Sequence, residues 1–201
     1  MPVPSSVLRQ PLPKERFLAP ILVLHLAALA LALGPPIFFG AVVAPAAFRI
    51  LPTRDLAATL QSPILSNACL LAEVAFLVLF ATSWLLTRQD APKMQRALMT
   101  RAAVLGFFAA LVIRQLLIPP IDRIREEAPG LIDSLPAADP SRLLLDRYHR
   151  LATGLFAAEV AAALVVLVVT ARLLSSRRSA PPPPPAAAGP SVPKLLDLSD
   201  V

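Results

Sequence analysis

Four long apolar segments, separated by short polar or proline-rich stretches, dominate the hydrophobic pattern of the chain. A helix rises about 1.5 Å per residue, so about 20 apolar residues are needed to cross the ~30 Å hydrocarbon core of a bilayer. We expect an all-α, polytopic integral membrane four-helix bundle over residues 18–174, preceded by a cytoplasmic segment of residues 1–17. The four predicted membrane spans cover about residues 18–43, 64–86, 97–118 and 151–171.

Prolines set the expected ends of these spans. The first apolar segment is too long for an upright span, and Pro35-Pro36 predicts a kink within it, of a kind that membrane helices tolerate. Ser62-Pro63 and Asp139-Pro140 each place a capping side chain before a proline, which is typical of a helix start. Pro119-Pro120 is expected to stop the third span. A signal peptide is the alternative for the first segment, but its apolar run is long and ends without a good cleavage site.

Composition supports a membrane protein and excludes several other classes. Hydrophobic residues make up 56% of the 201-residue chain and charged residues 16%, with a mean hydropathy of +0.68, whereas soluble domains carry about 25% charged residues. One cysteine cannot form an internal disulfide framework or a Cys-based zinc cluster. The sequence contains no Gly-rich phosphate loop, Ser/His/Asp set or metal-ligand spacing. We therefore expect no enzyme activity, no cofactor and no bound metal.

The basic residues predict which side of the membrane the chain ends occupy. If residues 1–17 lie inside, the cytoplasmic side holds eleven of the 19 Lys and Arg residues and the outer side seven, with Arg114 inside the third span. Because a surplus of Lys and Arg marks the cytoplasmic side, we expect both termini in the cytoplasm and the protein in the cell (inner) membrane. This topology also explains the net charge of +6. The expected partners are therefore the lipid bilayer and a second copy or another membrane protein, and not nucleic acid.

Residues 175–201 form a separate C-terminal tail in the sequence. They include a run of prolines at 181–185 that is followed by alanines. Such a composition cannot bury a core and predicts a disordered or polyproline-like segment. The apolar and acidic residues at 195–198 are a candidate docking motif for a partner, and an inert solubilising tail is the alternative.

Three charged side chains fall inside the predicted spans. Glu73 and Glu159 lie roughly 12 to 13 Å from the outer ends of their helices, and Arg114 lies roughly 6 Å from the outer end of its own. A charge at the middle of a membrane helix costs ~2.5–3.5 kcal/mol, so such residues are usually paired or functional. We expect Arg114 to pair with one of the two glutamates. The pair is interpreted as a structural ion pair, as a proton- or cation-linked binding site, or as side chains that snorkel to the surface.

The two histidines lie at different depths of the predicted bundle. His25 lies within the first span and His149 at the outer end of the fourth, on the order of 20 Å apart along the membrane normal. One haem iron could not bind both at that separation. We interpret His25 as a packed polar residue and His149 as an interfacial histidine, with a gating or ligand-binding role as the alternative for His149.

Glycines within the spans predict close helix packing. A glycine with a small residue four positions later lets membrane helices approach each other. In an alanine-rich chain such pairs also arise by chance. The pairs in this chain are Gly40 with Ala44, Gly106 with Ala110 and Gly154 with Ala158.

Three stretches together resemble a bacterial family of uncharacterised four-helix membrane proteins that is similar to the transmembrane protein 205-like domain. They are residues 37–48 (IFFGAVVAPAAF), residues 118–121 (IPPI) and residues 146–151 (DRYHRL). The most specific points are the stretch from Pro45 to Phe48 and the histidine His149. The family often has a serine three residues after this histidine, where this chain has Ala152. The resemblance covers about residues 18–174 and implies four spans and a membrane location, with no established activity and a suggested link to metal or drug resistance.

These observations support two functional hypotheses. In the first, the chain is a non-enzymatic small transporter or an accessory subunit of one. Its substrate or ligand would bind at Glu73, Arg114, Glu159 and His149. In the second, it is a structural or assembly protein that recruits a partner through its cytoplasmic tail. Replacement of both glutamates by glutamine distinguishes the two, because transport would fail whereas a scaffold would survive.

Overall fold

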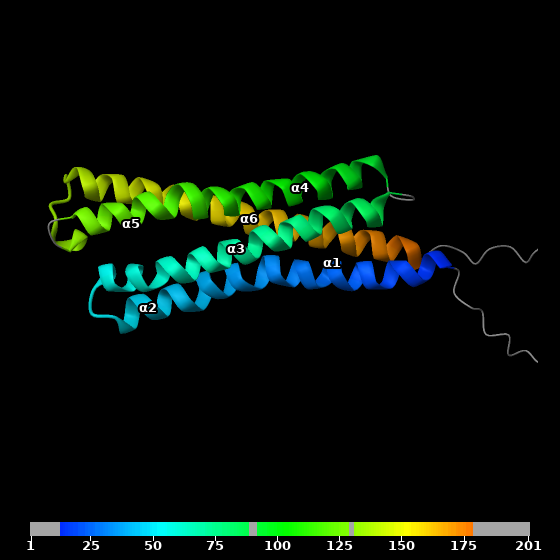
Figure 1. Ribbon diagram of the computed structural model, residues 1–201, viewed down its shortest axis with the longest axis horizontal. Coiled ribbons are helices and arrows are strands. Elements are labelled where there is room, and N and C mark those ends of the chain that lie inside the picture. The colour runs from blue at the N-terminus through cyan, green and yellow to red at the C-terminus, as the bar shows by residue number, and fades with distance from the viewer. Residues whose placement is uncertain (1–12, 89–91, 129–130, 179–201) are drawn as a thin grey trace, which may run out of the picture.

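Four long helices make up the part of the chain that the computed structural model describes, which is residues 13–88, 92–128 and 131–178 (Figure 1). The first and third long helices are composite, because each contains a π-helical turn between two α-helical segments. In chain order the elements are α1 Pro13–Phe38, the π-turn η1 Phe39–Val43, α2 Ala44–Ile50, α3 Arg54–Thr87, α4 Lys93–Val112, the π-turn η2 Ile113–Leu117, α5 Ile118–Glu127, the short 3₁₀ helix η3 Ile132–Ser134 and α6 Pro140–Arg178.

The long helices form a closed bundle in which each packs against two neighbours. α3 contacts α1 and α4, and α6 contacts α4 and α1. Successive helices run in opposite directions, so the start of α1 and the end of α6 lie at the same end of the bundle (Figure 1). We call this end the terminal end, and we call the opposite end, which carries residues 51–53, residue 128 and residues 131–139, the loop end. Both described chain ends therefore lie on one side of the bundle.

Each of the four helices is long and apolar enough to cross a membrane. They contain 33, 34, 35 and 37 residues, so each extends roughly 50 Å, well beyond the ~30 Å hydrocarbon core of a bilayer. Only 28–44% of the most apolar part of each helix is buried inside the bundle. The rest exposes many leucine, valine and phenylalanine side chains, a surface that suits lipid better than water. The prediction of an all-α four-helix bundle is confirmed for the described residues, which contain no strand.

Small side chains form much of the core of this bundle. Fully buried alanines come from all four long helices and include Ala32, Ala72, Ala103 and Ala163. A small side chain at a contact lets two helix backbones approach closely, and van der Waals packing of this kind drives helix association in lipid. The alanine-rich composition therefore has a direct role in packing.

A π-helical turn stands just ahead of a proline in both composite helices. η1 precedes Pro45, and η2 precedes Pro119-Pro120. In each case the residue after the turn donates its backbone N–H to the carbonyl five residues earlier. Proline lacks an N–H group, and its ring clashes with the carbonyl four residues before it. The extra residue of a π-turn changes the position of those carbonyls, which explains how the helix continues through the proline.

The helices are longer than the predicted spans because their prolines do not interrupt them. The first helix continues through Pro35-Pro36, and its irregular turn is η1, which begins three residues later. Pro63 lies inside α3, so the predicted helix start at this proline is wrong. Pro119-Pro120 lies inside the third helix, which continues to Glu127, so the predicted stop at these residues is also wrong.

Capping side chains mark the true starts of the second and fourth helices. Thr53 caps α3, because its side-chain oxygen accepts the backbone N–H of Leu56 at 3.2 Å. Asp139 accepts the backbone N–H of Ser141 at 2.8 Å, which confirms the predicted start of the last helix at Pro140. α6 then continues four residues into the predicted C-terminal tail, and the remainder of that tail lies outside the described residues.

Gly106 is the glycine at which close packing is required. A side-chain carbon added at this position would overlap the ring of Phe76, which is itself fully buried. By contrast, an added carbon at Gly154 would meet no atom within 4 Å. The predicted close approach is therefore present on α4 and absent at the corresponding glycine on α6.

We expect Gly106→Ala to destabilise the bundle, because the new methyl group forces the buried ring of Phe76 to move. Overpacking of this kind costs about 1–3 kcal/mol, and it should lower the thermal unfolding temperature of the detergent-solubilised protein. Gly154→Ala is the matched control, which should leave stability unchanged or raise it because alanine favours helix by up to ~1 kcal/mol. Equal stability of the two variants would contradict the packing of Phe76 on Gly106.

Candidate functional site

A bidentate ion pair joins the second and third long helices within their apolar length. Arg114 Nε donates to Glu73 Oε1 at 2.6 Å, and Arg114 Nη2 donates to Glu73 Oε2 at 2.7 Å. Glu73 is buried, whereas the Arg114 side chain is 24% exposed. Two parallel charge-assisted hydrogen bonds make this a strong and geometrically specific pair. Of the two glutamates that the sequence offered as partners, the structure pairs Arg114 with Glu73.

The π-turn η2 carries this arginine. Arg114 and its neighbour Gln115 both belong to η2. In the amide orientation that satisfies both side chains, the Gln115 oxygen accepts from Arg114 Nη2 at 3.1 Å and from Nη1 at 3.3 Å. A π-turn inserts one residue into a helix, which rotates the side chains on its two sides by roughly 100° relative to each other. The direction of Arg114 towards Glu73 therefore depends on η2.

Glu159 is almost completely buried and has no hydrogen-bond partner among the described residues. Its exposed fraction is 1%, and neither Oε1 nor Oε2 accepts a hydrogen bond there. It lies on α6 within electrostatic range of Glu73, whose charge is already balanced by Arg114. An isolated buried carboxylate costs several kcal/mol unless its charge is balanced. Glu159 therefore needs a proton or a cation as its partner.

Cys69 completes the buried group of polar side chains. It lies one helical turn before Glu73 on the same face of α3, is 1% exposed, and is within electrostatic range of both glutamates. We call Cys69, Glu73, Arg114 and Glu159 the buried cluster. Within the described ranges, no three His, Cys, Asp or Glu side chains come together as metal ligands. The cluster therefore contains one ion pair whose charges balance, Arg114 with Glu73, and one carboxyl group without a charged partner, Glu159.

A cavity of about 340 Å³ lies on the loop-end side of the buried cluster. We call it the loop-end cavity. Its walls are largely apolar and aromatic, with Phe39, Phe48 and Phe156 among the lining residues, while Arg125 and His149 add polar groups. Both π-turns contribute to the lining, a position at which such turns often have functional roles.

The loop-end cavity reaches to within one helical turn of the buried cluster. On α3 the lining extends to Leu65, and Cys69 follows four residues later. On α6 it extends to Phe156, and Glu159 follows three residues later. Side chains three or four residues apart share one face of a helix. The cavity and the cluster therefore follow one another along the inner faces of α3 and α6.

A second polar group lies at the edge of the loop-end cavity. Ser62 Oγ donates to Asp122 Oδ2 at 2.7 Å, and Arg125 Nη1 lies 3.8 Å from Asp122 Oδ1. The buried Nε of Arg125 has no partner among the described residues. Ser62 and Arg125 line both the loop-end cavity and a neighbouring hollow of about 380 Å³. The sequence pattern did not indicate this group, because a span that stops at Pro119-Pro120 leaves Asp122 and Arg125 outside the predicted helix.

The residues that carried the family resemblance lie close to the loop-end cavity. Phe48 and His149 line it, and Pro45 is the second residue of α2, which follows η1 on the same composite helix. Pro35 and Pro36 lie in the last turn of α1, where Pro36 is buried. Of the predicted binding residues, Glu73, Arg114 and Glu159 form one cluster, whereas His149 belongs to the cavity. Their roles in binding stay predictions.

Comparison with known proteins identifies no relative of this chain. No protein family, no curated protein and no solved structure matches it. The resemblance to the transmembrane protein 205-like domain therefore stays a prediction that rests on the sequence stretches themselves.

We expect Arg114→Leu to destabilise the bundle strongly. Removal of one partner of a buried ion pair typically lowers the free energy of unfolding by about 3–5 kcal/mol. Addition of Glu73→Gln should restore part of this loss, because the carboxylate left behind no longer carries a charge. The measurement is a double-mutant cycle of unfolding free energies in detergent. The cycle with Glu159→Gln in place of Glu73→Gln serves as the comparison and should show the smaller coupling. Additive effects of Arg114→Leu and Glu73→Gln would exclude the pair.

Proposed function

We propose that this chain is a small multi-pass transporter of the cell (inner) membrane that moves protons, with Glu159 as the proton-carrying group. The observation that carries this proposal is a carboxyl group that is 1% exposed and unpaired among the described residues, beside an ion pair that is already neutral. Ionisable side chains within a membrane are energetically expensive, and they typically mark ion pathways or proton relays.

A proton suits Glu159 better than a metal cation does. Ca²⁺ and Mg²⁺ take six or more oxygen ligands, and a single carboxyl group supplies two. Cys69 and Glu73 are the neighbouring acidic groups, and Glu73 is held in two hydrogen bonds by Arg114. A proton needs one oxygen atom and no further ligand. Its gain or loss changes the net charge of the buried cluster by one, because the Arg114–Glu73 pair stays neutral.

The loop-end cavity supports a binding site for a small amphipathic molecule beside the proton-carrying group. Its aromatic walls favour apolar groups, and Arg125 and His149 favour a hydrogen-bond acceptor. Pockets with mostly apolar walls and a few polar groups are typical of small-molecule sites. The short distance along α3 and α6 between this cavity and Glu159 supports an influence of such a molecule on the rate at which protons move.

The basic residues support an orientation with both termini in the cytoplasm. In that orientation the terminal end of the bundle faces the cytoplasm, and the loop-end cavity faces the outer side. Arg88, which lies at the terminal end, places its guanidinium carbon 4.8 Å from the centre of the Trp84 ring. A tryptophan beside a basic residue suits the interface between lipid and water.

We expect reporters fused after Gln89 and after Ser179 to be cytoplasmic, and a reporter placed within residues 129–138 to be external, because Lys and Arg are in surplus on the terminal side. The measurement is a pair of reporters that are active only inside or only outside the cell. A cytoplasmic reporter within residues 129–138 would reverse the orientation.

We expect the purified protein in lipid vesicles to dissipate an imposed pH gradient, and Glu159→Gln to slow this dissipation by at least about tenfold, the effect of losing a proton-transfer group. A pH-sensitive dye inside the vesicles measures the rate. Glu127→Gln is the matched control, because it removes the same charge from an exposed position at the loop end. This variant should behave as the unchanged protein.

Two outcomes would contradict the proposed function. If vesicles with the unchanged protein hold the gradient as long as empty vesicles do, the chain does not move protons. If Glu159→Gln and Glu127→Gln dissipate the gradient equally fast, Glu159 is not the proton-carrying group. The first result would favour the alternative of a structural or assembly protein.

A further inference from the structure

The loop-end cavity is polar at one end and apolar at the other. Arg125 and His149 are the lining residues of α5 and α6 that lie nearest to the loop end. Phe39 and Phe156 line the opposite, inner end, because the first long helix runs towards the loop end and α6 runs away from it (Figure 1). The cavity therefore has the polarity of an amphipathic molecule whose polar head lies towards the loop end.

Two aromatic rings close the inner end of the cavity. The rings of Phe39 and Phe156 meet edge to face, with their centroids 6.2 Å apart. From His149 to Phe156 the wall on α6 rises by seven residues, roughly 10 Å along the helix. The volume of about 340 Å³ is near the lower end of the range of about 300–1,000 Å³ that is typical of small-molecule sites. The cavity therefore suits one short apolar chain rather than the two long chains of a membrane lipid.

Arg125 is the cation of this lining, and its hydrogen bonds are incomplete. Asp122 lies 3.8 Å from Arg125 Nη1, which is beyond hydrogen-bond distance, and it accepts a hydrogen bond from Ser62 instead. The buried Nε of Arg125 has no partner among the described residues. Asp122 and Asp55 lie within electrostatic range of Arg125, but no described Asp or Glu lines the cavity itself. The guanidinium therefore keeps donors for an acceptor inside the cavity, and its charge favours an anion there.

The ion pair of Arg114 shows which anion a guanidinium of this protein holds. Arg114 donates through Nε and Nη2 to both oxygens of the Glu73 carboxylate, at 2.6 and 2.7 Å. The planar guanidinium matches a carboxylate because two parallel charge-assisted hydrogen bonds form at once. In Arg125 the corresponding Nε lacks a partner among the described residues. A carboxylate from outside the chain would complete the same arrangement at Arg125.

The helices α2 and α6 leave a side of the cavity uncovered. α2 packs against α3, and α5 packs against α3 and α6, whereas α2 and α6 make at most marginal contact among the described elements. Phe48 on α2 is 47% exposed and Thr153 on α6 is exposed, although both line the cavity. A molecule that is dissolved in the membrane can therefore enter from the side, with its chain leading towards the phenylalanine rings.

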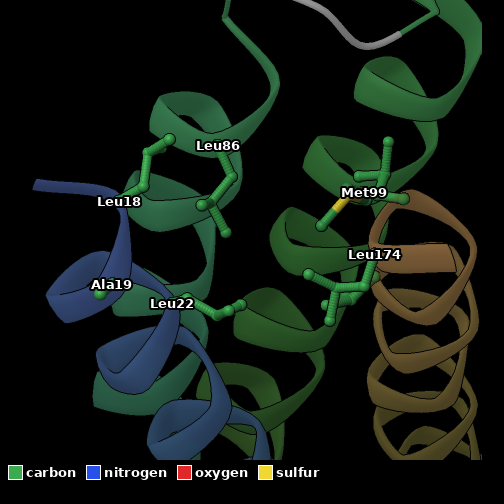
Figure 2. A pocket seen from close by; sticks show the side chains of 8 residues that line it. Leu18, Ala19, Leu22, Leu86, Met99 and Leu174 are labelled. Atoms are coloured by element: carbon green, nitrogen blue, oxygen red, sulfur yellow. The ribbon is translucent and has the colours of Figure 1, made fainter. Parts of the chain in front are cut away.

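The smaller cavity near the terminal end has no such site for a charged head. The hydroxyl oxygen of Thr170, the polar side chain of its lining, lies 3.0 Å from Nε2 of the fully buried His25, whose Nδ1 lies 2.8 Å from the hydroxyl oxygen of Thr82. This cavity of about 110 Å³ has no charged residue in its described lining. Figure 2 shows the apolar side chains around it, which include Leu18, Leu22, Leu86, Met99 and Leu174.

From these features we infer that the loop-end cavity binds a monoanionic amphiphile, namely a carboxylate that carries one short apolar chain. The carboxylate lies on Arg125, and the ring N–H of His149 is a second donor at the same end. The chain packs between the phenylalanine rings of the inner end. This inference rests on the proposed function, because it names the chemical class of the molecule that the cavity binds beside Glu159.

Quenching of tryptophan fluorescence by octanoate that carries bromine on its chain tests this site. Phe48→Trp combined with Trp84→Phe places the one tryptophan of the chain in the cavity wall. The protein is held in nanodiscs of zwitterionic lipid at about pH 8, where a carboxylic acid is ionised. We expect saturable quenching of this reporter. Trp84 of the unchanged chain is exposed near the end of α3, and its quenching should rise without saturation because the probe there is dissolved in lipid.

The head of the probe and the charge of Arg125 are then varied. Bromine-labelled octylammonium and octanol have a similar chain without the negative charge, and we expect neither to quench the reporter saturably. Arg125→Gln should weaken the binding of octanoate by about tenfold or more, the effect of losing charge-assisted hydrogen bonds. Arg123→Gln is the matched control, because Arg123 is exposed on the same helix and lines neither the cavity nor the neighbouring hollow. It should leave the affinity unchanged.

Filling of the cavity tests the site with Arg125 intact. Ala152 lines the cavity on α6, whereas Ala157 is exposed on the same helix and does not line it. We expect Ala152→Leu to weaken the binding of octanoate by about tenfold, because the larger side chain takes the space of the apolar chain. Ala157→Leu should leave the affinity unchanged. Unfolding temperatures of the four variants exclude a general loss of structure.

Equal affinity for octanoate and octylammonium, or equal affinity of Arg125→Gln and Arg123→Gln for octanoate, would overturn the inference. Binding is measured without a pH gradient, so its result is independent of proton movement. Saturable binding that depends on Arg125, in a protein that does not dissipate a pH gradient, would overturn the proposed function and support the site. Dissipation that depends on Glu159, without saturable binding of octanoate, would overturn the site while the proposed function stands.

Discussion

The ion pair between Arg114 and Glu73 determines how the polar interior of this bundle is arranged. A buried charge is costly unless it is paired, so this pair favours the arrangement in which the second and third long helices face each other at this level. The two hydrogen bonds of 2.6 and 2.7 Å require the direction that Arg114 takes from the π-turn η2. Because the pair is neutral, it leaves Glu159 as the unbalanced group of the buried cluster. The proposed proton chemistry follows from this division of charge.

The polar side chains of the interior lie at two levels of an otherwise apolar bundle. The buried cluster lies towards the loop end, next to a cavity lined by aromatic residues. His25 and its two threonines lie towards the terminal end, next to a smaller cavity. Between the two levels the core consists of alanine, valine, leucine and phenylalanine side chains, among them Ala163, Val166 and Phe76. Each group carries a desolvation cost, which the two hydrogen bonds between Arg114 and Glu73 offset at the first level and the hydrogen bonds of His25 offset at the second.

The hydropathy pattern predicted the number of helices and the helix class, because a segment that is apolar over about 20 residues has few stable alternatives to a helix. It also placed Glu73, Arg114 and Glu159 in the same outer half of the bundle, since depth follows from position along a helix of known rise. The pattern failed at the prolines. Pro63 and Pro119-Pro120 lie within helices, and in the second case the helix continues by means of η2, a feature that depends on one extra residue per turn and has no signature in composition.

The sequence by itself therefore determined that four apolar helices carry a few charges at defined depths. Only the tertiary structure decided which of these groups meet. Arg114 is 41 residues from Glu73, and His25 is 57 and 145 residues from its two threonine partners. Helical periodicity relates residues three or four positions apart, whereas contacts between helices depend on how each helix is rotated about its axis. That rotation is fixed by the fit of small residues such as Gly106 against Phe76 and by the π-turns, and it brings Arg114 to Glu73 while Glu159 remains unpaired among the described residues.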